Sequence, residues 1–114
     1  MSQQQISIEQ AASLLKLLSD KTRLTIVKLL EHQDCCVCEL VEIFQVSQPS
    51  ISQHLRKLRD AGIVKEERRG QWIFYSICTE NNNFPFIKQV LSQIPNQKEK
   101  LIELERSGKK INCC

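Results

Sequence analysis

The 114-residue sequence contains no run of about 18 consecutive apolar residues, the length that signals a membrane-spanning helix. Its first residues lack the basic stretch and following apolar run of an export signal. A phosphate-cradling loop that follows a strand is also absent. We therefore expect a cytoplasmic protein that contacts no membrane and is not an enzyme.

Length and charge limit the organisation further. A chain of 114 residues has room for one compact domain, but not for separate catalytic and recognition domains. We predict one domain over residues 1–108 and a mobile tail without pattern over residues 109–114. The 16 basic and 13 acidic residues give a net charge of +3, so any nucleic-acid affinity must come from where the charges lie.

Six cysteines are many for a chain of this length, and they lie at positions 35, 36, 38, 78, 113 and 114. Such a number can indicate a disulfide scaffold in exported proteins. Because cytosolic thiols are kept reduced and no export signal is found, reduced thiols in a ligand-binding role are the favoured interpretation.

Hydrophobic periodicity predicts several helices and one β-hairpin. Helices are expected from near residue 7, over 20–31, over 38–45 and from Ser47 to just before Gly62. Two β-prone runs, 63–68 and 71–77, predict the hairpin, and helical spacing returns over 84–94 and from about 97. The predicted fold class is mainly α with a small β-hairpin, in the element order of a winged helix-turn-helix.

The polar face of the helix that begins at Ser47 carries the candidate DNA contacts. Its donors recur at helical spacing opposite the apolar stripe, which suits base edges or phosphates in a major groove. The predicted contacts are Ser50, Gln53, His54 and Lys57, flanked by Ser52 and Arg56, with Arg68, Arg69 and Gln71 at the hairpin tip. An ordinary solvated face is the alternative, but the turn, the cap and the hairpin together favour double-stranded DNA as the partner.

Three stretches of the sequence, 18–24, 46–55 and 60–64, closely resemble the ArsR/SmtB family of metalloregulatory repressors. The resemblance spans about residues 8–94. It implies a homodimer that packs through its first and last helices, binds a palindromic operator and is released by metal. It also adds Ser47 and Gln48 to the candidate DNA contacts. The interface positions it suggests are Leu14, Leu17, Phe86, Leu91 and Ile94, for which an intramolecular core is the alternative.

Cys36 and Cys38 are the candidate ligands of the releasing ion. In a regular helix their side chains would point about 200° apart, so they can share an ion only at a helix edge, where the sequence places them. A helix N-terminus stabilises thiolate over thiol, which predicts reactive sulfurs. Thiolates favour soft ions such as arsenite, antimonite, cadmium, lead or cuprous copper.

The segment 36–40 resembles the arsenic-binding box Cys-Val-Cys-Asp-Leu of the arsenical members of the family, with Glu39 in place of aspartate. Some of those members carry a third cysteine one helical turn later, where this chain has Val41. The third sulfur must then come from elsewhere. The adjacent Cys35 is slightly preferred, and Cys113 and Cys114 are its rivals, because six extended residues span roughly 20 Å.

These features predict a repressor that leaves its operator when As(III) or Sb(III) binds cysteine thiolates, with no permanent cofactor. A redox- or sulfur-responsive repressor in which the cysteines oxidise is the main alternative. The resemblance implies that a cadmium or lead sensor of this family would add cysteine ligands from an N-terminal arm. Residues 1–34 contain no cysteine, so such a sensor is less favoured. A zinc, nickel or cobalt sensor would need harder histidine and carboxylate ligands on the last helix. It is disfavoured because the only histidines, His32 and His54, lie elsewhere in the sequence.

Overall fold

A polar cap begins the first helix of the computed structural model, which describes residues 6–107. Helix α1 (Ile8–Leu18) follows Ser7, whose hydroxyl accepts a hydrogen bond from the backbone N–H of Gln10 at 3.0 Å. The Gln10 side chain accepts from the backbone N–H of Ser7 in return. This reciprocal pair confirms the predicted helix start near residue 7.

Two further helices form a helix-turn-helix. Helix α3 (Val37–Phe44) ends at Gln45, whose left-handed backbone, with φ of 56°, turns the chain sharply. Helix α4 (Gln48–Asp60) then begins after Ser47, whose hydroxyl accepts from the backbone N–H of Ser50 at 3.2 Å. The two helices therefore follow each other across a tight connection, as the sequence predicted.

The sheet has three strands, one more than the predicted hairpin. Strands β2 (Val64–Arg69) and β3 (Trp72–Ile77) form that hairpin, with Gly70 at a φ of 65° in its turn. The two-residue strand β1 (Cys35–Cys36) pairs antiparallel with the other side of β3, which gives the order β1-β3-β2. The cysteine segment is thus attached to the wing.

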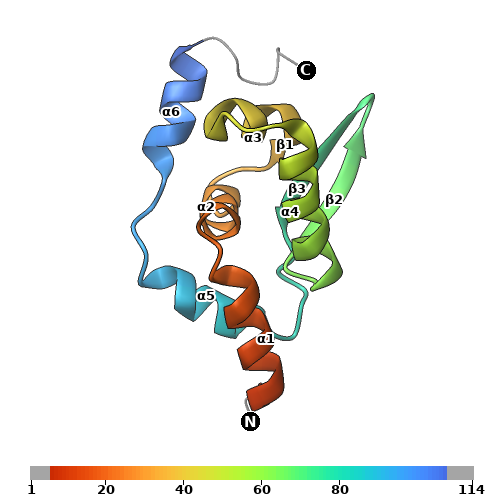
Figure 1. Ribbon diagram of the computed structural model, residues 1–114, viewed down its shortest axis with the longest axis vertical. Helices are drawn as coiled ribbons and strands as arrows, with labels where there is room; N and C mark the ends of the chain where they lie inside the picture. The colour runs from red at the N-terminus through yellow and green to blue at the C-terminus, as the bar shows by residue number, and fades with distance from the viewer. Residues whose placement is uncertain (1–5, 108–114) are drawn as a thin grey trace.

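The C-terminal part of the described chain contains two separate helices. Helix α5 (Phe84–Ser92) ends before Pro95, and helix α6 (Lys98–Arg106) begins after it, which confirms the predicted break. Helix α6 packs against α3, as Figure 1 shows at one end of the molecule. The C-terminal end of the described chain therefore lies close to the helix that begins at the cysteines.

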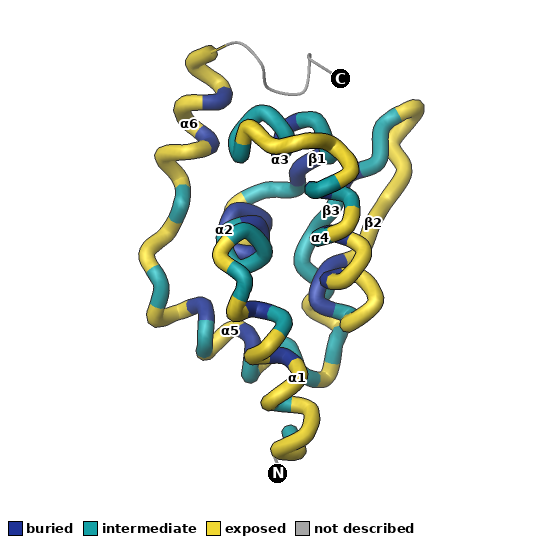
Figure 2. The backbone as a smooth tube through the Cα atoms, in the orientation of Figure 1, coloured by how far each residue is buried: buried dark blue, intermediate teal, exposed yellow. Residues whose placement is uncertain are grey.

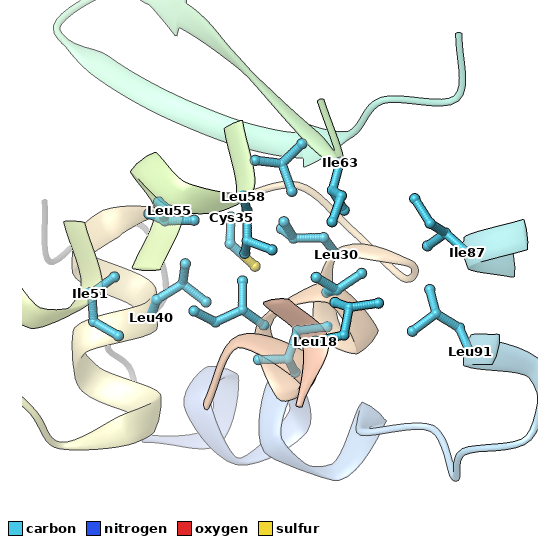
Figure 3. Close-up of a cluster of buried hydrophobic side chains, with 14 of the residues drawn as sticks. Leu18, Leu30, Cys35, Leu40, Ile51, Leu55, Leu58, Ile63, Ile87 and Leu91 are labelled. Carbon is cyan, nitrogen blue, oxygen red and sulfur yellow. The ribbon is translucent and has the colours of Figure 1, made fainter. Parts of the chain in front are cut away.

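Helix α2 (Lys21–Leu30) lies at the centre of the core. Its residues 26–30 are all buried, and it packs against α1, α4 and β3. Figure 2 shows this contrast in burial, with α2 mainly buried and the tip of the hairpin exposed. Figure 3 shows the shared cluster, which includes Leu18, Leu30, Leu40, Ile51, Leu55, Leu58, Ile63, Ile87 and Leu91. The mainly helical winged fold with a small sheet is confirmed.

The helical spacing of Ile8, Ala11, Leu15 and Leu18 predicts one apolar stripe on α1, and the structure buries only Leu18 of these four. Leu14 and Leu18 are buried, whereas Ile8 is 83% exposed and Leu15 is 48% exposed. The exposed pair leaves apolar surface on the outer side of α1 in the single chain.

The predicted tail, residues 109–114, lies outside the described residues, and so do Cys113 and Cys114. Within residues 6–107, no helix is both long and apolar enough to cross a membrane.

Asp20→Ala is expected to lower the free energy of unfolding by about 1 kcal/mol at neutral pH, because Asp20 caps α2 by accepting from the N–H of Arg23 at 3.0 Å. This backbone hydrogen bond lowers the pKa of Asp20, and the electrostatic interactions of its carboxylate with Arg23 and His54 lower it further. A lowered pKa stabilises the fold above the ordinary aspartate pKa of about 3.9, and this stabilisation is lost as the pH falls through the folded-state pKa.

Urea unfolding at pH 7 and at pH 3 checks this prediction. The difference between wild type and Asp20→Ala should shrink at pH 3. Asp20→Asn is the matched control, since it keeps an acceptor oxygen without the titratable group and should retain most of the stability at pH 7. An equal loss for Asp20→Ala at both pH values would contradict the assignment.

Candidate nucleic-acid interface and cysteine site

Helix α4 is anchored by three side chains with no exposed surface: Ile51, Leu55 and Leu58. Their burial fixes which face of α4 points outward. On that outer face Gln53, Arg56 and Lys57 are exposed, and Ser50, Ser52 and His54 are half-buried. The structure therefore presents the predicted set of polar side chains on one accessible helix surface.

Several of these polar side chains already have partners within the chain. The Ser47 hydroxyl serves as the N-cap of α4, so part of its role is structural. Gln48 donates from Nε2 to the Ser52 hydroxyl at 2.7 Å. His54 Nδ1 lies 3.2 Å from a terminal guanidinium nitrogen of Arg23, and Nε of Arg23 donates to the Leu17 carbonyl at 2.8 Å. These bonds position the face of α4 relative to α1 and α2.

At the wing, the two predicted arginines differ. Arg68 and Gln71 are exposed. Arg69 forms ion pairs with Asp34 and Glu67 and stacks over the ring of Phe74, with 4.6 Å from its guanidinium carbon to the ring centroid. Because Asp34 directly precedes β1, Arg69 connects the wing to the cysteine segment.

The structure brings Cys36 and Cys38 together. Their Sγ atoms lie 3.3 Å apart at the beginning of α3, where Cys36 is the N-cap residue and still has an extended backbone. This is the helix edge at which the two sulfurs were expected to converge.

A buried carboxylate holds this edge in place. Glu39 is 1% exposed, and its Oε1 accepts a hydrogen bond from the backbone N–H of Cys36 at 3.0 Å. Burial raises the pKa of the Cys36 thiol, the Glu39 charge raises it further, and the backbone N–H groups of Glu39 and Cys38 act in the opposite direction. The expectation of an unusually reactive thiol is therefore wrong for Cys36, because burial outweighs the helix N-terminus. Sequence reasoning missed this role of Glu39, although the spacing from Cys36 is that of a capping box.

Cys35 points away from the pair. It is fully buried in the core cluster, and Figure 3 shows it among Leu40, Leu55 and Leu58. Adjacent residues of a strand face opposite sides, so β1 directs Cys35 into the core and Cys36 to the other side. Cys35 is consequently not beside the sulfur pair in this conformation.

A pocket of about 230 Å³ opens beside the two sulfurs. It is lined by Cys36 and Cys38, by Val37 between them, by Gln48 at the start of α4, and by Gln71 and Trp72 of the hairpin. An occupant of this pocket would touch both DNA-reading elements. Within residues 6–107, no cluster of three or more His, Cys, Asp or Glu side chains has the arrangement of a metal site.

The candidate interface residues fall into two groups. Leu14 and Leu91 lie in the core of the single chain. Leu17, Phe86 and Ile94 are half-buried. The half-buried group is therefore the one whose surface is available to a partner.

Comparisons with known proteins find similarity to bacterial regulatory proteins. A family profile described as "Bacterial regulatory protein, arsR family" matches residues 20–66. The arsenic resistance transcriptional regulator ArsR1 of Pseudomonas putida is 44% identical over 66 residues, which are 57% of this chain and 52% of that protein. The match thus spans about half the length of that relative. An arsenical resistance operon repressor of Staphylococcus xylosus is 38% identical over 75 residues, 66% of this chain and 72% of that protein.

Among solved structures, the homodimeric winged helix-turn-helix domain Mb0332 of Mycobacterium bovis aligns with a TM-score of 0.62 and 26% identity. The alignment covers 82% of this chain and 91% of that one. Its title describes a possible ArsR-family transcriptional regulator. These relatives are regulators, in agreement with the expectation that the chain is not an enzyme.

Proposed function

Because the chain belongs to the ArsR family of bacterial regulatory proteins, we propose that it is a cytoplasmic transcriptional repressor that binds operator DNA as a homodimer and is released by arsenite or antimonite. The observation that carries the proposal is the Cys36–Cys38 pair, with 3.3 Å between its sulfurs, at the edge of the helix that leads into the DNA-reading helix. In this proposal residues 1–108 are one DNA-binding and dimerisation unit.

The chemistry of the donors favours a soft ion. Cys36 and Cys38 offer two sulfur ligands side by side, and sulfur ligands suit As(III) or Sb(III).

The third thiolate is assigned to Cys113 or Cys114 rather than to Cys35. Two observations support this change of preference. Cys35 would have to leave the core to reach the pair. Ser107 lines the same hollow as Glu42 of α3 and Gln45, which follows it. Helix α3 is about 12 Å long, and six extended residues span roughly 20 Å, so a sulfur six residues after Ser107 can reach the start of α3.

The proposed dimer uses the first and last helices. Exposed Ile8 and Leu15 on α1 would lose water contact in such an interface, which favours association. The half-buried Leu17, Phe86 and Ile94 are retained as interface positions. Leu14 and Leu91 would support them from the core side.

The proposed DNA contacts are the exposed polar face of α4 and the wing. Gln53 is placed against base edges, and Arg56, Lys57 and Arg68 against phosphates. Release follows because an ion held by Cys36 and Cys38 lies against both elements: the pocket includes Gln48 of α4 and Trp72 of β3. Allosteric couplings of about 1–3 kcal/mol, or 5-fold to 150-fold in affinity, are sufficient to vacate an operator.

The test is a titration of the reduced dimer, bound to a fluorescent duplex selected from a random-sequence pool, with sodium arsenite. Fluorescence anisotropy should report a 5-fold to 150-fold loss of affinity for wild type and no loss for Cys36→Ser or Cys38→Ser. Cys78→Ser is the matched control, because Cys78 lies at the end of the wing away from the pair, and it should respond as wild type does.

Two further variants identify the third sulfur. The double variant Cys113→Ser/Cys114→Ser should lose most of the arsenite response, whereas Cys35→Ala should keep it. If wild type ignores arsenite and is released by peroxide instead, the redox alternative replaces this proposal. Release by cadmium or lead but not by arsenite would show that the protein responds to one of those ions instead.

A further inference from the structure

The polar face of α4 contains one histidine that a neighbouring helix contacts. Nδ1 of His54 lies 3.2 Å from a terminal guanidinium nitrogen of Arg23, in the first turn of α2. We propose that Arg23 is a positioning residue that holds His54 as its Nε2–H tautomer, so that His54 contacts the operator as a hydrogen-bond donor to an acceptor atom of the DNA. This inference rests on the proposed function, because it uses the DNA-binding face of α4.

The chemistry of the two side chains decides which ring nitrogen carries the proton. An arginine guanidinium has five N–H donors and no acceptor, and it stays charged in proteins. A hydrogen bond from Arg23 to Nδ1 therefore requires a bare Nδ1 with its lone pair available. This excludes the Nδ1–H tautomer and the doubly protonated ring alike. The single proton of the ring is then on Nε2.

Arg23 is itself held on two sides. Its Nε donates to the Leu17 carbonyl of α1 at 2.8 Å, and its backbone N–H donates to the Asp20 carboxylate at 3.0 Å. The guanidinium is a rigid planar fork, so the bond to Leu17 also orients the terminal nitrogen that contacts His54. The ring of His54 therefore has a partner that is in place before DNA arrives.

Nε2 of His54 is available to an external acceptor. Its ring has one hydrogen bond within residues 6–107, the bond from Arg23 to Nδ1. No buried side-chain nitrogen or oxygen in that part of the chain lacks a partner. Since His54 is half-buried and Nε2 has no partner there, Nε2 is open to solvent.

A group that only donates discriminates between base edges. In the major groove guanine offers O6 and N7, adenine N7 and thymine O4 as acceptors, whereas the amino groups of adenine and cytosine are donors. The Nε2–H of His54 can pair with these acceptors or with a phosphate oxygen, but not with the amino groups. The neighbouring Ser50 and Gln53 can both donate and accept, so His54 imposes the stricter requirement on the DNA.

Nuclear magnetic resonance of the reduced, ¹⁵N-labelled full-length chain tests the tautomer without DNA. Long-range ¹H–¹⁵N correlations distinguish the protonated ring nitrogen from the bare one. The chain has two histidines, and His54→Gln assigns their signals. At about pH 8.5, above the ordinary histidine pKa of about 6.5, His54 should show the Nε2–H tautomer alone.

His32 is the internal control for this measurement. It is exposed and has no side-chain hydrogen bond within residues 6–107, so it should show a mixture of tautomers. The same mixture at His54, or a proton on Nδ1 of His54, would overturn the inference.

Operator binding tests the role of the donor. Fluorescence anisotropy on the selected duplex, without arsenite, should report about tenfold weaker binding for His54→Ala, which loses the donor. Arg23→Met should bind about fivefold more weakly, because an unrestrained ring adopts the binding orientation only part of the time. His32→Gln is the matched control and should bind as wild type does. If Arg23→Met does not fold by circular dichroism, the wild-type tautomer and His54→Ala decide.

A double-mutant cycle separates positioning from a purely structural role of Arg23. In the His54→Ala background Arg23→Met should cost less than a further twofold, because Arg23 acts through the ring. A full fivefold loss in that background would overturn the positioning role.

Modified duplexes identify the acceptor. 7-Deazapurines lack N7, 6-thioguanine and 4-thiothymine replace the carbonyl oxygens by sulfur, and methylphosphonates replace one phosphate oxygen. One of these changes should weaken wild type about tenfold and His54→Ala less than twofold. A methylphosphonate with this effect would assign His54 to the backbone, and a modified base would assign it to sequence recognition.

The outcomes distinguish this inference from the proposed function. Wild-type operator affinity of His54→Ala, or the lack of any modified duplex that behaves in this way, would overturn the donor role and leave DNA binding intact. Failure of the wild-type chain to select any duplex would overturn both.

Discussion

Leu55→Ala is expected to lower the free energy of unfolding by about 2–5 kcal/mol. Leu55 has no exposed surface and lies in the cluster shared by α2, α3 and α4, so truncation removes buried methyl groups and leaves a cavity. The loss is a large part of the total stability of a small domain, which is about 5–15 kcal/mol. Urea unfolding at one fixed protein concentration measures it, because dimerisation makes stability concentration-dependent.

Gln53→Ala is the matched control on the opposite face of the same helix. Gln53 is exposed, so its removal should change the unfolding free energy by less than about 0.5 kcal/mol. If Gln53 contacts a base edge as proposed, the same variant should weaken operator binding by about 1–3 kcal/mol. A stability loss for Gln53→Ala as large as that for Leu55→Ala would contradict the placement of Gln53 on the exposed face of α4 and of Leu55 on its buried face.

Lys28→Met is expected to lower the free energy of unfolding by about 1.5–3 kcal/mol. Lys28 is 5% exposed, and its Nζ donates to the Leu91 carbonyl at 3.0 Å and pairs with Glu31 at 2.7 Å. Methionine keeps the apolar stem but removes the charge that joins α2 to the end of α5. The charged hydrogen bond and the partner of Glu31 are therefore lost together.

Lys65→Met is the control for the lysine variant. Lys65 pairs with Glu80 at 3.5 Å, and both side chains are largely exposed. Exposed pairs contribute about 0–1 kcal/mol, so this variant should unfold close to the wild-type midpoint in the same urea experiment. Equal losses at Lys28 and Lys65 would show that the burial of Lys28 is not important.

The elements that the sequence predicted correctly have local signals. The start of α4 depends on Ser47 and the next few residues, and its apolar stripe recurs within one helix. The hairpin likewise depends on two neighbouring β-prone runs and Gly70. Capping, helical periodicity and turn chemistry all act over a few residues, so one sequence is sufficient to find them.

The features that were missed depend on residues far apart in the chain. Strand β1 has two residues, and it exists because Cys35 and Cys36 pair with residues about 40 positions later. The contact between His54 and Arg23 joins two helices, and nothing in either local pattern indicates it. The exposure of Leu15 likewise depends on how α1 packs in three dimensions.

For the cysteine site, the sequence predicted the pairing of Cys36 with Cys38 but not the separation of Cys35 from them. Three nearby cysteines look equivalent in a linear pattern. Strand pairing makes them different, because alternate residues of β1 face opposite sides. The predicted thiolate reactivity failed for a similar reason, since the burial of Cys36 and of Glu39 depends on the packed fold.

The register of β1 decides which sulfur faces the pocket and which fills the core. A one-residue slip of a strand turns each of its side chains to the opposite face. A slip of β1 along β3 in one direction would bring Asp34 to the core position of Cys35, and a slip in the other direction would bring Val37 to the pocket position of Cys36. The pairing of β1 with β3 therefore keeps a charged side chain out of the core and a sulfur in the pocket at the same time.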